Sequence, residues 1–195
     1  MKTLTQHIAE RLQLNKDRIK KYDYKYFPET KKELGSIMDE IIRQNKNEKI
    51  IDLNIIDTSK ITDMAGLFYY DRFIYDISRW DVSNVENMDS MFYYTKQVDC
   101  DISNWNVSRV ENMENMFTGS DFNGDISRWN VSHVKDMSGM FEDSKFNQDI
   151  SKWDVSNVEH MCYMFNKSKF NQDLTPWKSK IKNKEQLQYI KDYIK

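Results

Sequence analysis

Large apolar residues recur along this chain at a fixed distance. The five tryptophans are separated by 25, 24, 24 and 24 residues, and the polar and apolar positions around each one are nearly the same. They are Trp80, Trp105, Trp129, Trp153 and Trp177. A fixed period between 20 and 50 residues is typical of repeat proteins, in which each unit buries its apolar face against its neighbours. The pattern predicts repeat units that start at positions 52, 76, 101, 125, 149 and 173.

Two apolar patterns follow each other within one unit. Trp80 and Val82 alternate with the polar Asp81, which is the period of a short strand. After Ser83, which we expect to cap a helical turn, a second apolar set has the spacing i, i+3, i+6 and i+7 of one helical face. That set is Val85, Met88, Met91 and Phe92. We therefore predict an α/β solenoid, a leucine-rich-repeat-like right-handed stack of short parallel strands and short helices.

The two ends of the chain depart from the repeat and predict helical caps. Residues 1–20 carry apolar side chains at helical spacing. A longer helix is expected over about 30–44, because Thr30 and Glu33 fit a capping box and an apolar stripe follows them. At the other end, one helical face can hold Leu187, Ile190 and Ile194. The predicted parts are an N-terminal helical cap (1–51), a repeat solenoid (52–177) and a C-terminal helical cap (178–195).

Charge is spread unevenly along the chain. Residues 52–172 hold 20 Asp and Glu against 11 Lys and Arg, whereas both ends carry an excess of Lys and Arg. An acidic body disfavours nucleic acid, whose binding depends on neutralising phosphates. No apolar run is long enough for a signal peptide or a membrane span, so we expect no membrane partner and a cytoplasmic protein, with virion association as the alternative. Cys100 and Cys162 lie more than two units apart, which predicts two reduced thiols.

The repeated columns can be interpreted as core or as ligand sites. Ile56 replaces tryptophan in the first unit, and because Ile fills volume but cannot stack on a ligand, we interpret the tryptophan column as core. The aspartates that start the units either bind calcium or accept backbone N–H groups of their own loops. They are Asp76, Asp101, Asp125, Asp149 and Asp173. The next column alternates Asp81, Asn106, Asn130 and Asp154, so it requires an acceptor oxygen and not a charge.

The chain contains three histidines, and they do not predict catalysis. His133 occupies a position that is Asn or Arg in other units, which is typical of a surface residue. A catalytic site requires one unique arrangement of residues, whereas a repeat spreads its Ser and Asp evenly. We predict that the protein is not an enzyme and has no cofactor.

The motif Asp-Ile-Ser-x-Trp-[Asp/Asn]-Val-Ser-x-Val-x-x-Met-x-x-Met-Phe, with Phe-Asn-Gln-Asp at 146–149 and 170–173, resembles the repeats of BspA-like bacterial surface proteins. The resemblance covers about 52–177 and implies a leucine-rich-repeat relative that makes protein–protein or adhesive contacts. The first dozen residues are similar to N-terminal segments of some tailed-phage internal head proteins. That second resemblance implies a phage origin as an alternative.

Positions that vary between units are free to bind a partner. Two such columns form a mildly basic stripe: Arg79, Asn104, Arg128 and Lys152, and Asn84, Arg109, His133 and Asn157. Charge complementarity orients docking, so we expect a partner protein with an acidic patch. A second candidate surface, which serves either as a binding anchor or as a cover for the N-terminal cap, is Tyr69, Tyr70, Tyr75, Tyr93 and Tyr94.

These patterns together predict a non-enzymatic protein–protein interaction module that presents a repeat-built surface. One alternative is a structural component or packaged cargo of a phage particle or other assembly. Another is an adhesin-type ligand binder. The sequence leaves the partner and the oligomeric state open.

Overall fold

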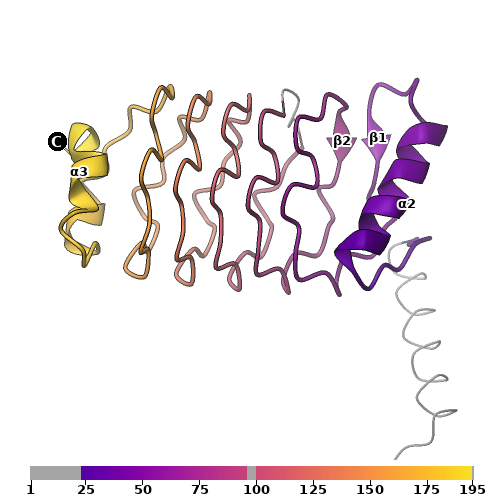
Figure 1. The fold of residues 1–195 in the computed structure, drawn as a ribbon, viewed down its shortest axis with the longest axis horizontal. Helices are drawn as coiled ribbons and strands as arrows, with labels where there is room; N and C mark the ends of the chain where they lie inside the picture. The colour runs from indigo at the N-terminus through magenta and orange to yellow at the C-terminus, as the bar shows by residue number, and fades with distance from the viewer. Residues whose placement is uncertain (1–22, 96–99, 195) are drawn as a thin grey trace, which may run out of the picture.

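A computed structural model describes residues 23–95 and 100–194 of the chain. Figure 1 shows similar coils side by side in a row, with helix α2 (Lys31–Gln44) at the N-terminal end and helix α3 (Leu187–Ile190) at the C-terminal end. Strands β1 (Ile51–Asp52) and β2 (Tyr75–Asp76) pair in parallel. Two short 3-10 helices complete the set, η1 (Thr175–Ser179) and η2 (Lys191–Tyr193). The helix expected over residues 1–20 lies outside the described residues.

Helix α2 confirms the helix expected near 30–44. Thr30 is its N-cap, and the Thr30 hydroxyl accepts the backbone N–H of Glu33 at 3.2 Å. The Glu33 carboxylate reaches back to the N–H of Glu29 at 2.7 Å, one residue before the position that a capping box predicts. The apolar stripe buries Leu34, Met38 and Ile41. Helix α2 therefore covers the N-terminal end of the row with its apolar face (Figure 1).

The predicted α/β solenoid of leucine-rich-repeat type is wrong. Among the described residues between 53 and 174, the only regular element is the two-residue strand β2, and no helix is present. The segment expected as a strand follows a turn, in which the N–H of Trp80 donates to the carbonyl oxygen of Ile77 at 3.1 Å. The segment expected as a helix, 85–92, has an isolated bridge at Asn87 followed by turns over 89–92. The units are therefore built from turns rather than from stacked strands and helices.

Left-handed residues explain why the helical spacing does not form a helix. Ser90 has a φ of 54° and Tyr94 a φ of 51°, and L-residues in this region interrupt a right-handed helix. The N–H of Met91 donates to the Met88 carbonyl three residues back, whereas the N–H of Phe92 donates to Met116 in the next unit at 2.9 Å. An α-helix would direct both N–H groups four residues back. Tight turns therefore produce the same apolar spacing as a helical face.

The same backbone conformation recurs in five successive units, although the residue types change. One column of positive φ consists of Gly66, Ser90, Asn115, Gly139 and Tyr163, and a second consists of Tyr70, Tyr94, Gly119, Asp143 and Lys167. Glycine adopts this region at little cost, but the other residue types do so less readily. Only some units carry glycine at these positions, so the sequences of the other units do not predict the left-handed turn.

Backbone hydrogen bonds join each unit to the next. Parallel bridges run through one position of five successive units: Asp63, Asn87, Asn112, Asp136 and His160. Next to them, the N–H of Met113 donates to the Asp136 carbonyl at 2.9 Å, and the N–H of Lys135 donates to Glu111 at 2.8 Å. Each unit thus provides donors and acceptors to both neighbours, which holds the units in register.

Side-chain oxygens shape three turns in one unit. Asp125 accepts the N–H of Ser127 at 2.9 Å, and Asn130 accepts that of Ser132 at 3.2 Å. A third residue, Asp136, accepts the N–H of Ser138 at 2.8 Å. Asp and Asn favour such turns because their short side chains reach the backbone two residues on. The polar residues of the motif therefore direct the chain around each coil.

Aromatic and sulfur-containing side chains fill the centre of the coils. The tryptophan column is buried, which confirms its assignment to the core, and the methionines and phenylalanines expected in the core are buried as well. One phenylalanine ladder runs through Phe68, Phe92, Phe117, Phe141 and Phe165, with ring centroids 5.3 to 5.9 Å apart. A shorter ladder joins Phe122, Phe146 and Phe170. The core is thus continuous from unit to unit.

The C-terminal end is covered by short helical segments rather than by one helix. Ile190 of α3 is buried, and Leu187 and Ile194 are partly buried against the core. The carbonyl of Tyr193 accepts the N–H of Leu174 at 2.7 Å, and its ring lies 5.1 Å from that of Phe165. This packing closes the apolar end of the row. The exact division into caps and repeats stays a prediction.

Candidate functional site

The eight residues predicted to bind a partner lie at the protein surface. Seven of them are exposed and Asn84 is half-buried. Arg109 connects two units, because its guanidinium donates to the Asn84 side-chain oxygen at 2.7 Å. The Asn84 amide in turn donates to the backbone carbonyl of Ser59 at 2.8 Å. The column of Asn84, Arg109, His133 and Asn157 is therefore continuous across at least its first two units.

Two asparagines of this column also have a structural role. Like Asn84, Asn157 donates from its amide to a serine carbonyl of the preceding unit, that of Ser132, at 2.8 Å. Its side-chain oxygen accepts from Lys182 near the C-terminal end at 3.3 Å. These contacts hold the asparagine side chains against the stack. The exposed surface of this column therefore differs between units chiefly at Arg109 and His133.

The basic residues of the other column lie close to carboxylates. The positive charges of Arg128 and Lys152 help to lower the pKa of Asp125 and Asp149, the aspartates three residues before them. Arg79 has the same relationship with Asp76. This part of the predicted basic stripe is therefore locally neutralised. Arg109 differs, because its hydrogen-bond partner is the neutral Asn84.

The aspartates that start the units accept backbone N–H groups. Each of the six carboxylates accepts from the residue two positions later: Asp52, Asp76, Asp101, Asp125, Asp149 and Asp173. The pKa of Asp125 lies below its usual value, chiefly because the Ser127 N–H donates to it. Within the described ranges, no group of three or more Asp, Glu, His or Cys side chains is arranged to hold a metal ion. The geometry favours turn formation as the role of this column.

Asparagines stand two residues before Asp125, Asp149 and Asp173. The side-chain oxygen of Asn123 accepts the backbone N–H of Asn147 at 2.8 Å, and that of Asn147 accepts the N–H of Asn171 at 2.9 Å. They therefore connect neighbouring units to one another.

The described histidines do not form a recognisable catalytic group. His133 is exposed, with its Nδ1 3.5 Å from the Ser132 hydroxyl, and the nearby Glu111 is paired with Lys135 at 2.6 Å. His160 takes part in the row of backbone bridges. His7 lies outside the described residues. Neither of the two described cysteines, Cys100 and Cys162, forms a disulfide within the described residues.

Four of the five predicted tyrosines form a surface cluster. Tyr69 stacks on Tyr93 with ring centroids 4.8 Å apart, and Tyr70 stacks on Tyr94 at 5.2 Å. Tyr75 does not belong to this group, because it is only 6% exposed and packs against Phe68. Its hydroxyl donates to Asp71 at 2.7 Å, and burial raises its pKa above the usual range. We call Tyr69, Tyr70, Tyr93 and Tyr94 the tyrosine cluster.

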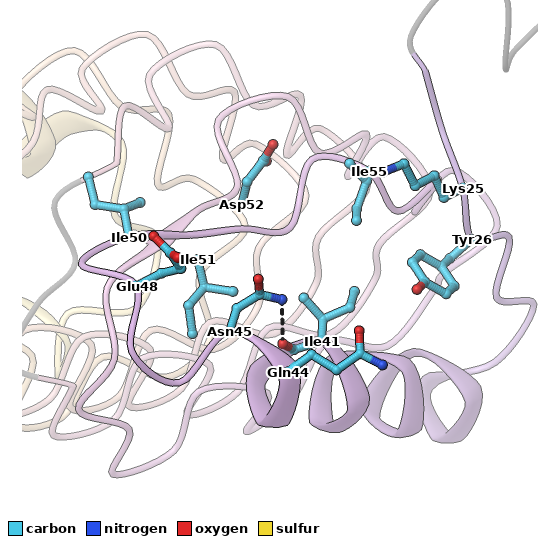
Figure 2. A pocket seen from close by; sticks show the side chains of 10 residues that line it. All are labelled: Lys25, Tyr26, Ile41, Gln44, Asn45, Glu48, Ile50, Ile51, Asp52 and Ile55. Atoms are coloured by element: carbon cyan, nitrogen blue, oxygen red, sulfur yellow. Dashed lines mark hydrogen bonds between the residues drawn. The ribbon is translucent and has the colours of Figure 1, made fainter.

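A hollow of about 380 Å³ lies between α2 and β1 at the N-terminal end. Figure 2 shows Ile41 and Asn45 on the helix side, Ile51 and Asp52 on the strand, and Tyr26 at the far side. The Asn45 amide donates to the Ile41 carbonyl at 2.8 Å and closes the end of α2. The lining mixes aliphatic side chains with charged ones, and it includes none of the eight predicted partner-binding residues.

A match to one family model is consistent with a repeat protein. In the part of the chain that the structure describes, no helix is long and apolar enough to cross a lipid bilayer. No curated protein and no solved structure matches the chain. One family model matches twice, over residues 36–145 and 117–192, and its description is "Mycoplasma protein of unknown function, DUF285". Since these matches span most of the sequence, including all complete repeats, the chain belongs to the DUF285 family.

Proposed function

We propose that this chain is a non-enzymatic protein–protein interaction module of the BspA-like repeat type. One observation carries the proposal: the apolar residues that recur in the units are buried, whereas seven of the eight residues that vary between units are exposed. Packing dictates the first group, and within the second group Asn84 and Asn157 also hold the backbone of the preceding unit. A repeat surface of this kind presents different side chains at a regular spacing to a partner.

Arg109 is the centre of the proposed surface. Its guanidinium is exposed, and Asn84 orients it without neutralising it. Arginine is common in binding hot spots because its planar group forms paired hydrogen bonds with carboxylates. Arg128 contributes less charge, because Asp125 lies nearby. An acidic patch on the partner, placed opposite Arg109, is the chemistry that fits this surface.

The test is a pull-down from the native cell, with the wild-type chain and an Arg109→Glu/Arg128→Glu variant as baits. The variant is expected to lose the captured partner while its melting temperature stays unchanged, because both side chains are exposed. A Lys167→Glu/Lys169→Glu variant introduces the same charge change at two other exposed positions. It should retain the partner. Equal capture by all three baits would remove Arg109 and its neighbours as the binding surface.

Further experiments distinguish the interaction module from the two alternative functions. Recovery of the chain from purified virions by mass spectrometry would favour the role as a phage component or cargo. Binding to a glycan array would favour an adhesin. A protein partner that depends on Arg109 would favour the interaction module.

A further inference from the structure

The tyrosine cluster is an ordered aromatic platform at the surface. Its four rings form two stacked pairs, Tyr69 with Tyr93 and Tyr70 with Tyr94, with interplanar angles of 5° and 8°. Neighbouring rings of the same unit meet at steep angles, with centroids 4.9 Å apart in both units. Each ring thus fixes two others, so little side-chain freedom remains to be lost on binding.

One side of this platform stays open. Tyr69 is 52% exposed and Tyr70 is 61% exposed, and each ring has one face on its partner in the next unit. Among the described residues, no other ring stacks on their opposite faces. On the far side, the Tyr94 ring lies against Gly119, where an added Cβ would come within 2.7 Å of ring carbons. The cluster is therefore packed against Gly119 at its Tyr94 end and exposed at Tyr69 and Tyr70.

Carboxylates lie near the Tyr93 and Tyr94 end of the cluster. Burial raises the pKa of Tyr94, and the charges of Asp143 and Glu142, two units further on, and a hydrogen bond to Asp143 raise it further. Asp71 follows Tyr70 directly in the chain, and Arg72 follows Asp71. Negative charge near the rings adds to the negative potential of their faces. The surroundings thus favour a cation over an anion.

We propose that the tyrosine cluster binds a lysine- or arginine-bearing segment of a partner protein, with the cationic group over the open faces of Tyr69 and Tyr70. A cation within about 6 Å of a ring centroid is attracted by the ring quadrupole. The carboxylates of Asp71, Glu142 and Asp143 attract the rest of a basic segment. This site is separate in sequence from the stripe around Arg109 and takes a partner of opposite charge, so it does not depend on the proposed function.

A hexa-arginine peptide is a suitable probe, with hexa-glutamate as the charge control. In a titration followed by amide chemical shifts, the largest changes are expected at Tyr69, Tyr70 and their stacked partners. Tyr69→Leu/Tyr70→Leu removes both open aromatic faces without changing the charge, so affinity should fall by about three- to tenfold. Tyr69→Phe/Tyr70→Phe keeps the faces and should bind within about twofold of wild type.

The matched control is Tyr163→Leu, since Tyr163 is 64% exposed and lies outside the cluster. It should bind like wild type. A Glu142→Gln/Asp143→Asn variant removes two charges and keeps all four tyrosines, and its affinity should also fall; it serves as the second test if the leucine variant fails to fold. Equal affinity of the leucine variant and wild type, or shifts spread over the Asp125 and Asp149 turns, would overturn the proposal. So would tighter binding of hexa-glutamate, or of neutral glycans through the same two rings.

Discussion

The indole N–H of Trp153 donates to the backbone carbonyl of Ile126, in the preceding unit, at 3.1 Å. Three other tryptophans make the same bond: Trp80 to Leu53, Trp129 to Ile102 and Trp177 to Ile150. Trp105 is the exception, because its buried Nε1 has no hydrogen-bond partner within the described residues. The tryptophan column therefore both fills the core and connects the units, except at this one position.

Trp153→Phe and Trp105→Phe should differ in their effect on stability. Both substitutions remove the same side-chain atoms, but only the first removes a hydrogen bond, since the Ile126 carbonyl then keeps the backbone N–H of Trp129 and loses the indole N–H. The free energy of unfolding should therefore fall by about 0.5–1.5 kcal/mol more for Trp153→Phe than for Trp105→Phe. Urea unfolding measures the difference. Equal losses would mean that the indole bond adds nothing to the packing.

Two glycines predict opposite effects of alanine. Gly35 lies inside α2, where a Cβ would meet nothing within 4 Å, so Gly35→Ala should stabilise the protein by about 0.5–1 kcal/mol. Gly139 has a φ of 62°, and its added Cβ would collide with the side-chain oxygen of Asn115. Gly139→Ala should therefore destabilise the protein by at least about 1 kcal/mol. Thermal unfolding of both variants checks the signs, and a stabilising Gly139→Ala would contradict the left-handed turn.

Acid should destabilise the protein through the aspartate turns. Hydrogen bonds from Ser127 and Ser151 hold the pKa of Asp125 and Asp149 below its usual value. A lowered folded-state pKa contributes stability above the unfolded pKa, about 3.9, and this contribution is lost as the pH falls through the folded value. The free energy of unfolding should therefore decline below about pH 4.

The control for this prediction is Asp125→Asn/Asp149→Asn. Asparagine keeps the acceptor oxygen, as Asn130 does in its own turn, but it does not titrate. The decline of stability with acid should be shallower in this variant. An identical pH profile would show that other carboxylates control the acid response.

Calcium should have no effect on the melting temperature. The aspartates that start the units accept N–H groups from their own turns, so folding does not require a metal ion to neutralise them. Scanning calorimetry with excess calcium and with a chelator tests this expectation. A higher melting temperature in calcium than in chelator would revive the metal interpretation of the column.

The sequence predicted the repeat and its buried columns, because volume and polarity repeat at one period. Ile56 in place of tryptophan already indicated core, and it is buried. The Thr30 cap was equally readable, since its geometry is local. What could not be read was the secondary structure of the unit. Met88, Met91 and Phe92 have helical spacing, but Ser90 adopts a left-handed conformation that is not predictable from a serine in the sequence.

The surface was harder to predict than the core. Variation between units correctly placed Arg109, His133 and Asn157 in solvent, but it did not show that Asn84 is half-buried or that Asn84 and Asn157 hold neighbouring backbones. Tyr75 was grouped with its neighbours because all five tyrosines lie close in the sequence. The structure shows that Tyr75 packs inward against Phe68, whereas Tyr69 stacks on Tyr93 at the surface.

Each unit offers its successor the same carbonyl oxygens that its predecessor offered to it, as the row of bridges from Asp63 to His160 shows. A gene duplication that inserted one more copy between Asp125 and Asp149 would therefore meet ready-made neighbours on both sides. Such a protein can lengthen or shorten by whole modules during evolution without the invention of any new contact.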